Sequence, residues 1–215
     1  QTPNIHIPEL ARDVLEQISF EARKSDYVDA KSGVSARLSI TAFENLLSTA
    51  ERRMLISGET KTSLRMVDFL GIISSINGKI ELVYEGEQEG AEQISYYLIS
   101  QAVKTLFPNY FPEVKKLEKE DEDGPYDNIL GWFFKDNELF LDDTLNDKDY
   151  KKLLDKLPGV DAIIKAHQPD CSQEDRYFLI EFLLWGLEAY KKLNKYRTLE
   201  GFQFKDTLGS YISRL

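Results

Sequence analysis

The stretch KSGVSARLSITAFENLLSTAERR, residues 31–53, joins a glycine turn to a run of apolar residues at helical spacing. Apolar side chains that recur every three or four positions mark one face of an α-helix. We therefore expect a long helix that begins soon after Gly33 and stops near Gly58, because glycine commonly follows the last turn of a helix. The residues that mark this helix are Leu38, Phe43, Leu46, Leu47, Ala50 and Met54.

Residues 8–24 predict an earlier amphipathic helix. Apolar residues follow Pro8 at spacings of three and four, and proline suits the first turn of a helix. Only the polar segment 25–33 separates this helix from the next one. The two helices should therefore pack as an antiparallel pair.

Residues 63–76 predict a third helix, which ends at the turn signal formed by Asn77 and Gly78. The segment 79–90 is ambiguous between a short strand and a helix. We favour a helix there, because residues 91–107 repeat apolar positions at helical spacing.

A charged run at residues 115–125 ends in Gly-Pro and predicts a linker. It would separate a helical domain at residues 1–114 from a helical extension at residues 126–215 that contains a small β-hairpin. We place the hairpin at ILGWFF (129–134) and ELFLDD (138–143), which flank three turn residues. Helices are expected at residues 147–157, 160–167 and 173–195, and residues 198–215 show no clear period. The predicted fold class is mainly α.

The formal net charge of −10 is spread along the chain. An acidic surface repels phosphate backbones and anionic lipids, so nucleic acid and membrane surfaces are unfavourable partners. We find neither a membrane span nor a signal peptide in the sequence. Cys171 is the single cysteine, which excludes an intramolecular disulfide and fits a reducing compartment. We expect a cytoplasmic protein.

The sequence contains no Walker A motif, dinucleotide-binding glycine motif, zinc-protease HExxH or nucleophile elbow GxSxG. The sequence therefore gives no support for autonomous nucleotide binding, zinc proteolysis or hydrolase chemistry. His6 and His167 are the only histidines, too few with Cys171 for a zinc site, and we expect His167 at a helix end.

Four acidic residues cluster in the ambiguous segment: Glu81, Glu85, Glu87 and Glu89. Carboxylates are ligands for Mg²⁺ and Ca²⁺, but this spacing matches no calcium-binding loop. We interpret the cluster as a solvated acidic loop and helix start, whose carboxylates interact favourably with the partial positive charge at the N-terminus of the following helix. We assign no metal site to it.

Arg37 is the one candidate binding residue. It lies in the first turn of the helix that is expected to begin soon after Gly33, in a row with Thr41 and Glu44 that points away from the apolar face. A guanidinium beside a helix N-terminus makes a local anion-binding spot. The alternative is a surface ion pair of Arg37 with Glu44 or Asp29.

Arg52 and Arg53 stand together beside Glu51, near the end of the same helix. Such a pair could reach a phosphate or a partner. A charged triplet of this kind is more often the wet face of a helix, and we favour that interpretation.

Two blocks, SGVSARLSI and GKIELVYEGEQEG, resemble the region after the ATPase core in AAA+ proteins of the magnesium chelatase ATPase-subunit type, close to the MoxR group. The resemblance covers about residues 8–112. The remaining half is similar to the C-terminal extension of the same branch, with less distinctive sequence.

This resemblance implies a helical lid, and Arg37 within SGVSARLS matches the position of the sensor-2 arginine. Its implied role is to contact nucleotide phosphates and to couple hydrolysis to lid movement. The implied cofactors, ATP and Mg²⁺, would be held by the full-length protein. The implied partners are the upstream AAA+ core, neighbouring subunits of a ring and a von Willebrand-type protein.

The Walker motifs, sensor 1 and the arginine finger of such a core would lie upstream of Gln1. We therefore expect this chain alone not to hydrolyse ATP. It would be either a fragment of a longer ATPase or a lid-like module without a core.

Two rival functions stay open at this stage. The first is a free-standing acidic interaction module, in which Arg37 is structural and the aromatic segment at Trp132, Phe133 and Phe134 docks a partner. The second is an enzyme that holds a metal through the carboxylates of EGEQEG.

Overall fold

The computed structural model describes residues 4–29, 31, 34–35, 37–76, 79–114 and 124–207. The chain consists of two compact units, Gln1–Leu106 and Phe107–Leu215. The division lies inside a helix, whereas the sequence places the boundary at the charged run, most of which lies outside the described residues. The predicted domain bounds therefore stay a prediction.

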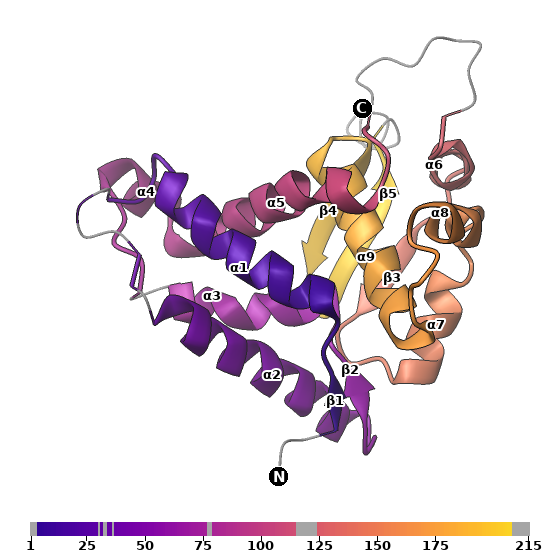
Figure 1. Ribbon diagram of the computed structural model, residues 1–215, viewed down its shortest axis with the longest axis horizontal. Helices are drawn as coiled ribbons and strands as arrows, with labels where there is room; N and C mark the ends of the chain where they lie inside the picture. The colour runs from indigo at the N-terminus through magenta and orange to yellow at the C-terminus, as the bar shows by residue number, and fades with distance from the viewer. Residues whose placement is uncertain are drawn as a thin grey trace. The chain divides into compact units, whose positions relative to one another are not determined.

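Unit 1 is built on the predicted antiparallel helix pair, α1 (Glu9–Lys24) and α2 (Leu38–Ile56). The two helices lie side by side (Figure 1), and Ser19 Oγ lies 3.1 Å from Ser39 Oγ where the end of α1 meets the start of α2. The buried face of α2 repeats at helical spacing, as the sequence predicts, and consists of Leu38, Ala42, Leu46, Ala50, Arg53 and Met54.

The predicted helix at residues 63–76 is only partly correct. Thr62–Ser63 forms a short strand, β2, which pairs in parallel with β1 (Ile5–His6). A 3₁₀ helix, η1 (Met66–Ile72), and a single α-helical turn, α3 (Ile73–Ile76), follow. Gly71 lies so close to α2 that a Cβ there would come within 2.0 Å of Thr49 Oγ1. This close approach of η1 to α2 is a tertiary contact, which the spacing of apolar residues in the sequence cannot predict.

The ambiguous segment 79–90 is not one helix. Its first part forms isolated antiparallel bridges, Val34 with Ile80 and Val28 with Leu82, and its second part is the short helix α4 (Tyr84–Glu89). Gly90 follows with a φ of 88°, which favours glycine, and separates α4 from α5 (Ala91–Tyr110). The segment therefore contains both bridges and a helix. The bridges could not be predicted from the segment itself, because their partners Val28 and Val34 are distant in sequence.

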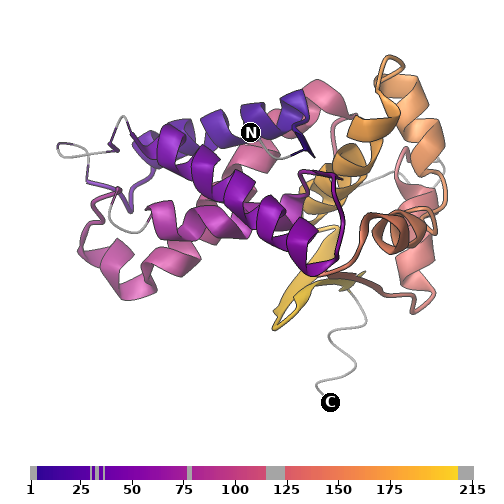
Figure 2. The ribbon, with the colours of Figure 1, turned by 90° about the horizontal axis from the view of Figure 1, so that it is seen from below.

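Unit 2 contains α6 (Asp127–Phe134), α7 (Asp147–Leu154), α8 (Val160–His167) and α9 (Gln173–Ala189). A three-stranded antiparallel sheet has the order β3-β5-β4, and α9 packs against β4 (Figure 2). Its strands are β3 (Leu139–Asp142), β4 (Leu193–Thr198) and β5 (Gly201–Asp206).

The predicted hairpin is placed wrongly, although a hairpin exists. Residues 129–134 belong to α6, in which Ile129 and Phe133 are buried one turn apart. The hairpin is formed by β4 and β5, which the sequence assigned to the end of a helix and to a segment without period. The predicted helix 173–195 ends early, and Lys191 just beyond it has a φ of 61° that a continuing helix could not contain.

The structure is mainly helical with a small antiparallel hairpin near the C-terminus, which confirms the predicted fold class. In the described part of the chain, no helix is both long and apolar enough to cross a membrane. Unit 2 has an aromatic core in which Phe107 contacts Phe182 at a centroid distance of 6.0 Å and a Cβ on Gly186 would lie 2.0 Å from the Phe107 ring.

Candidate functional site

Arg37 stands at the N-cap of α2, one position before the first turn in which the sequence places it. Its φ and ψ of −83° and −6° are helical, and its side chain is exposed. The first turn contains no acidic residue, and no side chain caps it. The partial positive charge of the helix N-terminus therefore adds to the guanidinium charge without a local carboxylate on the helix itself.

The N-terminus of α2 is held in place by the segment that precedes α4. The Ser35 amide donates to the Lys79 carbonyl at 3.1 Å, beside the Val34–Ile80 bridge. Ser35 also holds the helix start, because its carbonyl accepts from the Leu38 amide at 2.9 Å and its Oγ from the Arg37 amide at 3.3 Å. These bonds fix the backbone from which the Arg37 side chain extends.

The surface ion pairs proposed as an alternative for Arg37 are not formed. Within the described ranges, Arg37 makes no side-chain hydrogen bond or ion pair with Glu44 or Asp29. Asp29 instead accepts from the Lys31 amide at 2.8 Å. The exposed guanidinium of Arg37 is thus directed to solvent rather than to an acidic neighbour.

The acidic cluster does not converge. The side chains of Glu81, Glu85, Glu87 and Glu89 are all exposed, and no three potential metal ligands come together among the residues that the structure describes. An open hollow of about 540 Å³ lies beside two of the carboxylates. It is lined by Ile80, Glu81, Leu82, Glu87 and Ala91.

The two histidines and the cysteine belong to different elements of secondary structure or to the segment between two of them. His6 is in β1, and His167 is the last residue of α8, the helix end that the sequence predicts. Cys171 is half-buried, and this burial raises the pKa of its thiol.

The aromatic segment 132–134 is divided between the interior and the surface. Phe133 is fully buried in α6 and meets Trp132 edge to face, with ring centroids 4.9 Å apart. Phe134 is 63% exposed. The segment is thus helical, with one ring of the three strongly exposed.

The prediction that Arg53 lies on the solvent-exposed face of its helix is wrong. Arg52 is exposed as expected, but Arg53 is only 3% exposed and lies on the buried face of α2. A helical count would have found it, because position 53 is three after Ala50 and seven after Leu46 on the buried row. The neighbouring charges at 51 and 52 hid this signal.

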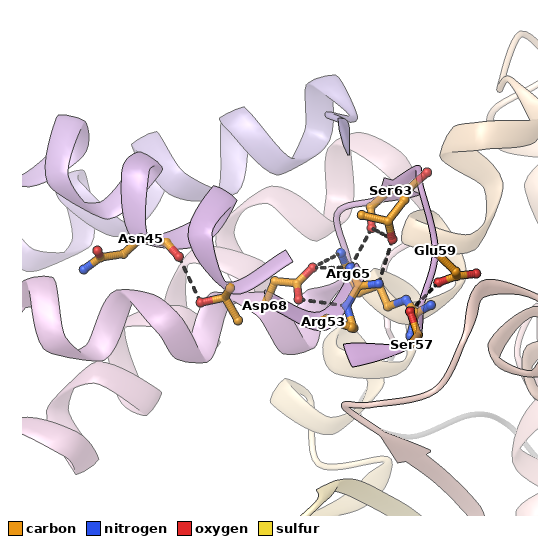
Figure 3. A network of polar contacts seen from close by, with 9 residues as sticks. Asn45, Arg53, Ser57, Glu59, Ser63, Arg65 and Asp68 are labelled. Carbon is orange, nitrogen blue, oxygen red and sulfur yellow. Dashed lines mark hydrogen bonds and ion pairs between the residues drawn. The ribbon is translucent and has the colours of Figure 1, made fainter. Parts of the chain in front are cut away.

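Arg53 is the centre of a buried polar network between α2, β2 and η1 (Figure 3). Its Nη2 and Nε contact the two carboxylate oxygens of Asp68 at 2.8 and 3.2 Å. Nη1 donates to Thr62 Oγ1 at 2.7 Å, and Nη2 also donates to the Ser63 carbonyl at 2.8 Å. Asp68, which is 1% exposed, further accepts from the Arg65 amide at 2.8 Å. The planar fork of arginine suits this bidentate geometry.

Besides Arg53 and Arg65, which are 3% and 1% exposed, Lys195 is a cation with a largely covered side chain, which is 11% exposed. Sequence reasoning missed it, because it was assigned to the end of a helix. It lies in β4, with its Nζ 3.5 Å from the centroid of the Trp185 ring and 3.0 Å from Glu188 Oε2. Burial lowers the pKa of the Lys195 ammonium, while Glu188 acts in the opposite direction. The contacts tie β4 to α9 by one ion pair and one cation–π interaction.

Comparisons with known proteins found no matching family model, no matching curated protein and no matching solved structure. The family resemblance therefore stays a prediction from the residues quoted above. Any function for this chain has to be argued from its own side chains.

Proposed function

We propose that this chain is the helical lid region, with its C-terminal extension, of a AAA+ ATPase of the magnesium chelatase or MoxR-like type. Arg37 acts as the sensor-2 arginine, which contacts nucleotide phosphates and couples hydrolysis to assembly or remodelling. ATP and Mg²⁺ belong to a Walker-bearing core outside this sequence, and the chain alone does not hydrolyse ATP.

The observation that carries this proposal is the placement of Arg37. Its exposed guanidinium sits at the N-cap of a 19-residue helix whose first turn has no acidic residue. Phosphate oxygens are favoured there for two reasons, because the helix N-terminus carries a partial positive charge and because arginine holds phosphate through a planar fork. A positive group on the transferred phosphoryl stabilises the charge that develops during hydrolysis.

The proposed setting follows from the same assignment. The chain works in the cytoplasm, with the AAA+ core, neighbouring ring subunits and a von Willebrand-type protein as partners. Its net charge of −10 disfavours nucleic acid and anionic membrane surfaces as ligands. Arg37 then supplies local positive charge in an acidic protein.

The test is to determine the coding sequence upstream of Gln1 and to measure ATP turnover of the full product with Arg37, Arg37→Ala and Arg37→Lys. We expect Arg37→Ala to lower kcat by at least about tenfold, since losing one charged contact to a transition state costs about 10²–10³ in enzymes with preorganised donors. Arg37→Lys should restore only part of the rate, because lysine lacks the fork.

Arg52→Ala is the matched control, since Arg52 is an exposed arginine on the same helix. Equal turnover in the Arg37→Ala and Arg52→Ala proteins would contradict the proposal, and so would the lack of a Walker-bearing core upstream. The interaction-module alternative would then be the better account, and the 63% exposure of Phe134 is the observation that favours it.

A further inference from the structure

Helix α2 carries the two arginines of interest at its opposite ends. Arg37 is the N-cap, and Arg53 lies in the last turn. At a rise of 1.5 Å per residue, the sixteen steps from residue 37 to residue 53 correspond to about 24 Å along the helix axis. An α-helix of this length moves as a rigid rod when its end is displaced, because each turn is hydrogen-bonded to the next.

The Arg53 end of α2 is bonded to β2 through two groups and to η1 through a third. Nη1 donates to the Thr62 hydroxyl and Nη2 to the Ser63 carbonyl, and the same guanidinium grips Asp68 of η1 (Figure 3). The contacts of Arg53 with Asp68 and with the Thr62 hydroxyl are shielded from water, since Arg53, Asp68 and Thr62 are 3%, 1% and 6% exposed. Shielding strengthens each contact and makes their loss costly.

On its other side, β2 holds the first described residues of the chain. The Thr62 amide donates to the Asn4 carbonyl at 3.0 Å, and the Leu64 amide donates to the His6 carbonyl at 3.0 Å. The strands are in parallel register, with Ile5 opposite Thr62. A continuous chain of bonds therefore runs from β1 through β2 and Arg53 into α2.

We infer that Arg53 is a positioning residue, which ties the strand β1 to the far end of the helix that presents Arg37. This inference rests on the proposed function, in which the ATPase core precedes β1. A displacement of β1 by that core is transmitted through β2 and the Arg53 fork to α2, and so changes where the Arg37 guanidinium stands. The connection needs arginine, because a lysine ammonium cannot hold two carboxylate oxygens and two β2 acceptors in one plane.

The first test uses this chain alone and measures amide hydrogen exchange. In Arg53→Lys, we expect the Thr62 and Leu64 amides to exchange at least about tenfold faster, because β2 loses its hold on α2. The Leu46 and Ala50 amides in the middle of α2 should change by less than about twofold.

Thr62→Val is a milder variant that removes one acceptor and keeps the Arg53–Asp68 pair, and it should accelerate the same two amides by about threefold. Asn45→Ala is the matched control, because it removes the 2.6 Å bond from α2 to Ser75 without touching β2. Unchanged exchange at Thr62 and Leu64 in both Arg53→Lys and Thr62→Val would overturn the inference. Uniform acceleration of all α2 amides in Thr62→Val would overturn it as well, since that result describes a purely structural contact.

The second test uses the full-length ATPase. We expect Arg53→Lys to lower kcat about tenfold with little change in KM, and the Arg37→Ala/Arg53→Lys double variant to be no slower than Arg37→Ala, because both act through one phosphate contact. If the kcat of the double variant falls by the product of the two single-variant losses, the positioning role of Arg53 is overturned. If Arg37→Ala is itself silent while exchange at Thr62 responds, the proposed function fails and the tie between β1 and α2 stands.

Discussion

Two cations with largely covered side chains, one in each unit, are held in different ways. Arg53 in unit 1 contacts two carboxylate oxygens, a hydroxyl and a carbonyl. Lys195 in unit 2 has one carboxylate, that of Glu188, and the face of the Trp185 ring. The partner of Arg53 is 1% exposed, whereas the partner of Lys195 is 27% exposed.

The difference shows what each cation can do. Arginine stays charged at any ordinary pH and uses its fork to join three segments of backbone. Lysine is a point charge that can lose its proton when buried, so its contact is more replaceable by an apolar side chain. We therefore expect Arg53 to dominate the stability of unit 1, and Lys195 to be a smaller and pH-dependent contribution in unit 2.

The largest expected effect is that of Arg53→Met. It leaves the Asp68 carboxylate buried without its counter-charge, and breaking a buried pair in this way costs about 3–5 kcal/mol of unfolding free energy. Urea unfolding followed by circular dichroism should show the loss, and hydrogen exchange in α2 should localise it to unit 1. Arg52→Met is the control and should change stability by less than about 0.5 kcal/mol. Equal effects of the two substitutions would contradict the importance of the fork.

Lys195→Met should have a smaller effect, a loss of about 1 kcal/mol. Methionine keeps an apolar contact with Trp185, and the Glu188 side chain is 27% exposed, against 1% for Asp68. Urea unfolding followed by tryptophan fluorescence reports on unit 2, because Trp132 and Trp185 both lie there. Lys165→Met, at an exposed lysine of α8, is the control. A loss as large as that of Arg53→Met would remove the contrast between the two cations.

The smallest expected effect is a pH dependence of the unfolding free energy that comes from Lys195 and not from Arg53. Because burial lowers the pKa of Lys195 in the folded chain, the unfolded chain binds more protons from that lowered value up to about pH 10.5. Within this window, the stability of the unsubstituted protein should rise with pH relative to Lys195→Met. Burial raises the pKa of Tyr126, which weakens folding above about pH 10, but this contribution is common to both proteins and cancels.

The measurement is urea unfolding of both proteins at steps between pH 8 and pH 10.5. The stability difference between the unsubstituted protein and Arg53→Met should stay flat over the same range, since arginine does not titrate there. A flat difference for Lys195→Met would show that its ammonium is not destabilised by burial.

Most of the helices could be predicted from the sequence, since a helix is announced by apolar spacing within its own residues. Helices α2, α7, α8 and α9 were found in this way, whereas α6 was not. The hairpin was misplaced because GWFF has the aromatic composition of a strand, while its burial at Ile129 and Phe133 follows the period of a helix. Strand β4 was missed because a charged lysine and arginine interrupt its alternation. Strand β5 was missed although Phe202 and Phe204 alternate with Gln203 and Lys205.

The candidate site was predictable in part. The sequence identifies Arg37 at the start of a helix, but the N-cap geometry and the absence of a pair with Glu44 or Asp29 in the described ranges appear only in the structure. Arg53 could have been placed on the buried row of α2 by counting, but its partners could not. Asp68 lies fifteen residues away, and no local pattern connects the two.

By itself, the sequence determined that this chain is mainly helical, acidic and without a motif for its own nucleotide hydrolysis. The tertiary structure alone decided that β1 pairs with β2, that β4 and β5 form the hairpin, and that Arg53 is buried on Asp68. The physical reason is one of range. Helix formation depends on neighbours three and four positions apart, whereas strand pairing and charge burial depend on groups that meet only when the chain is folded.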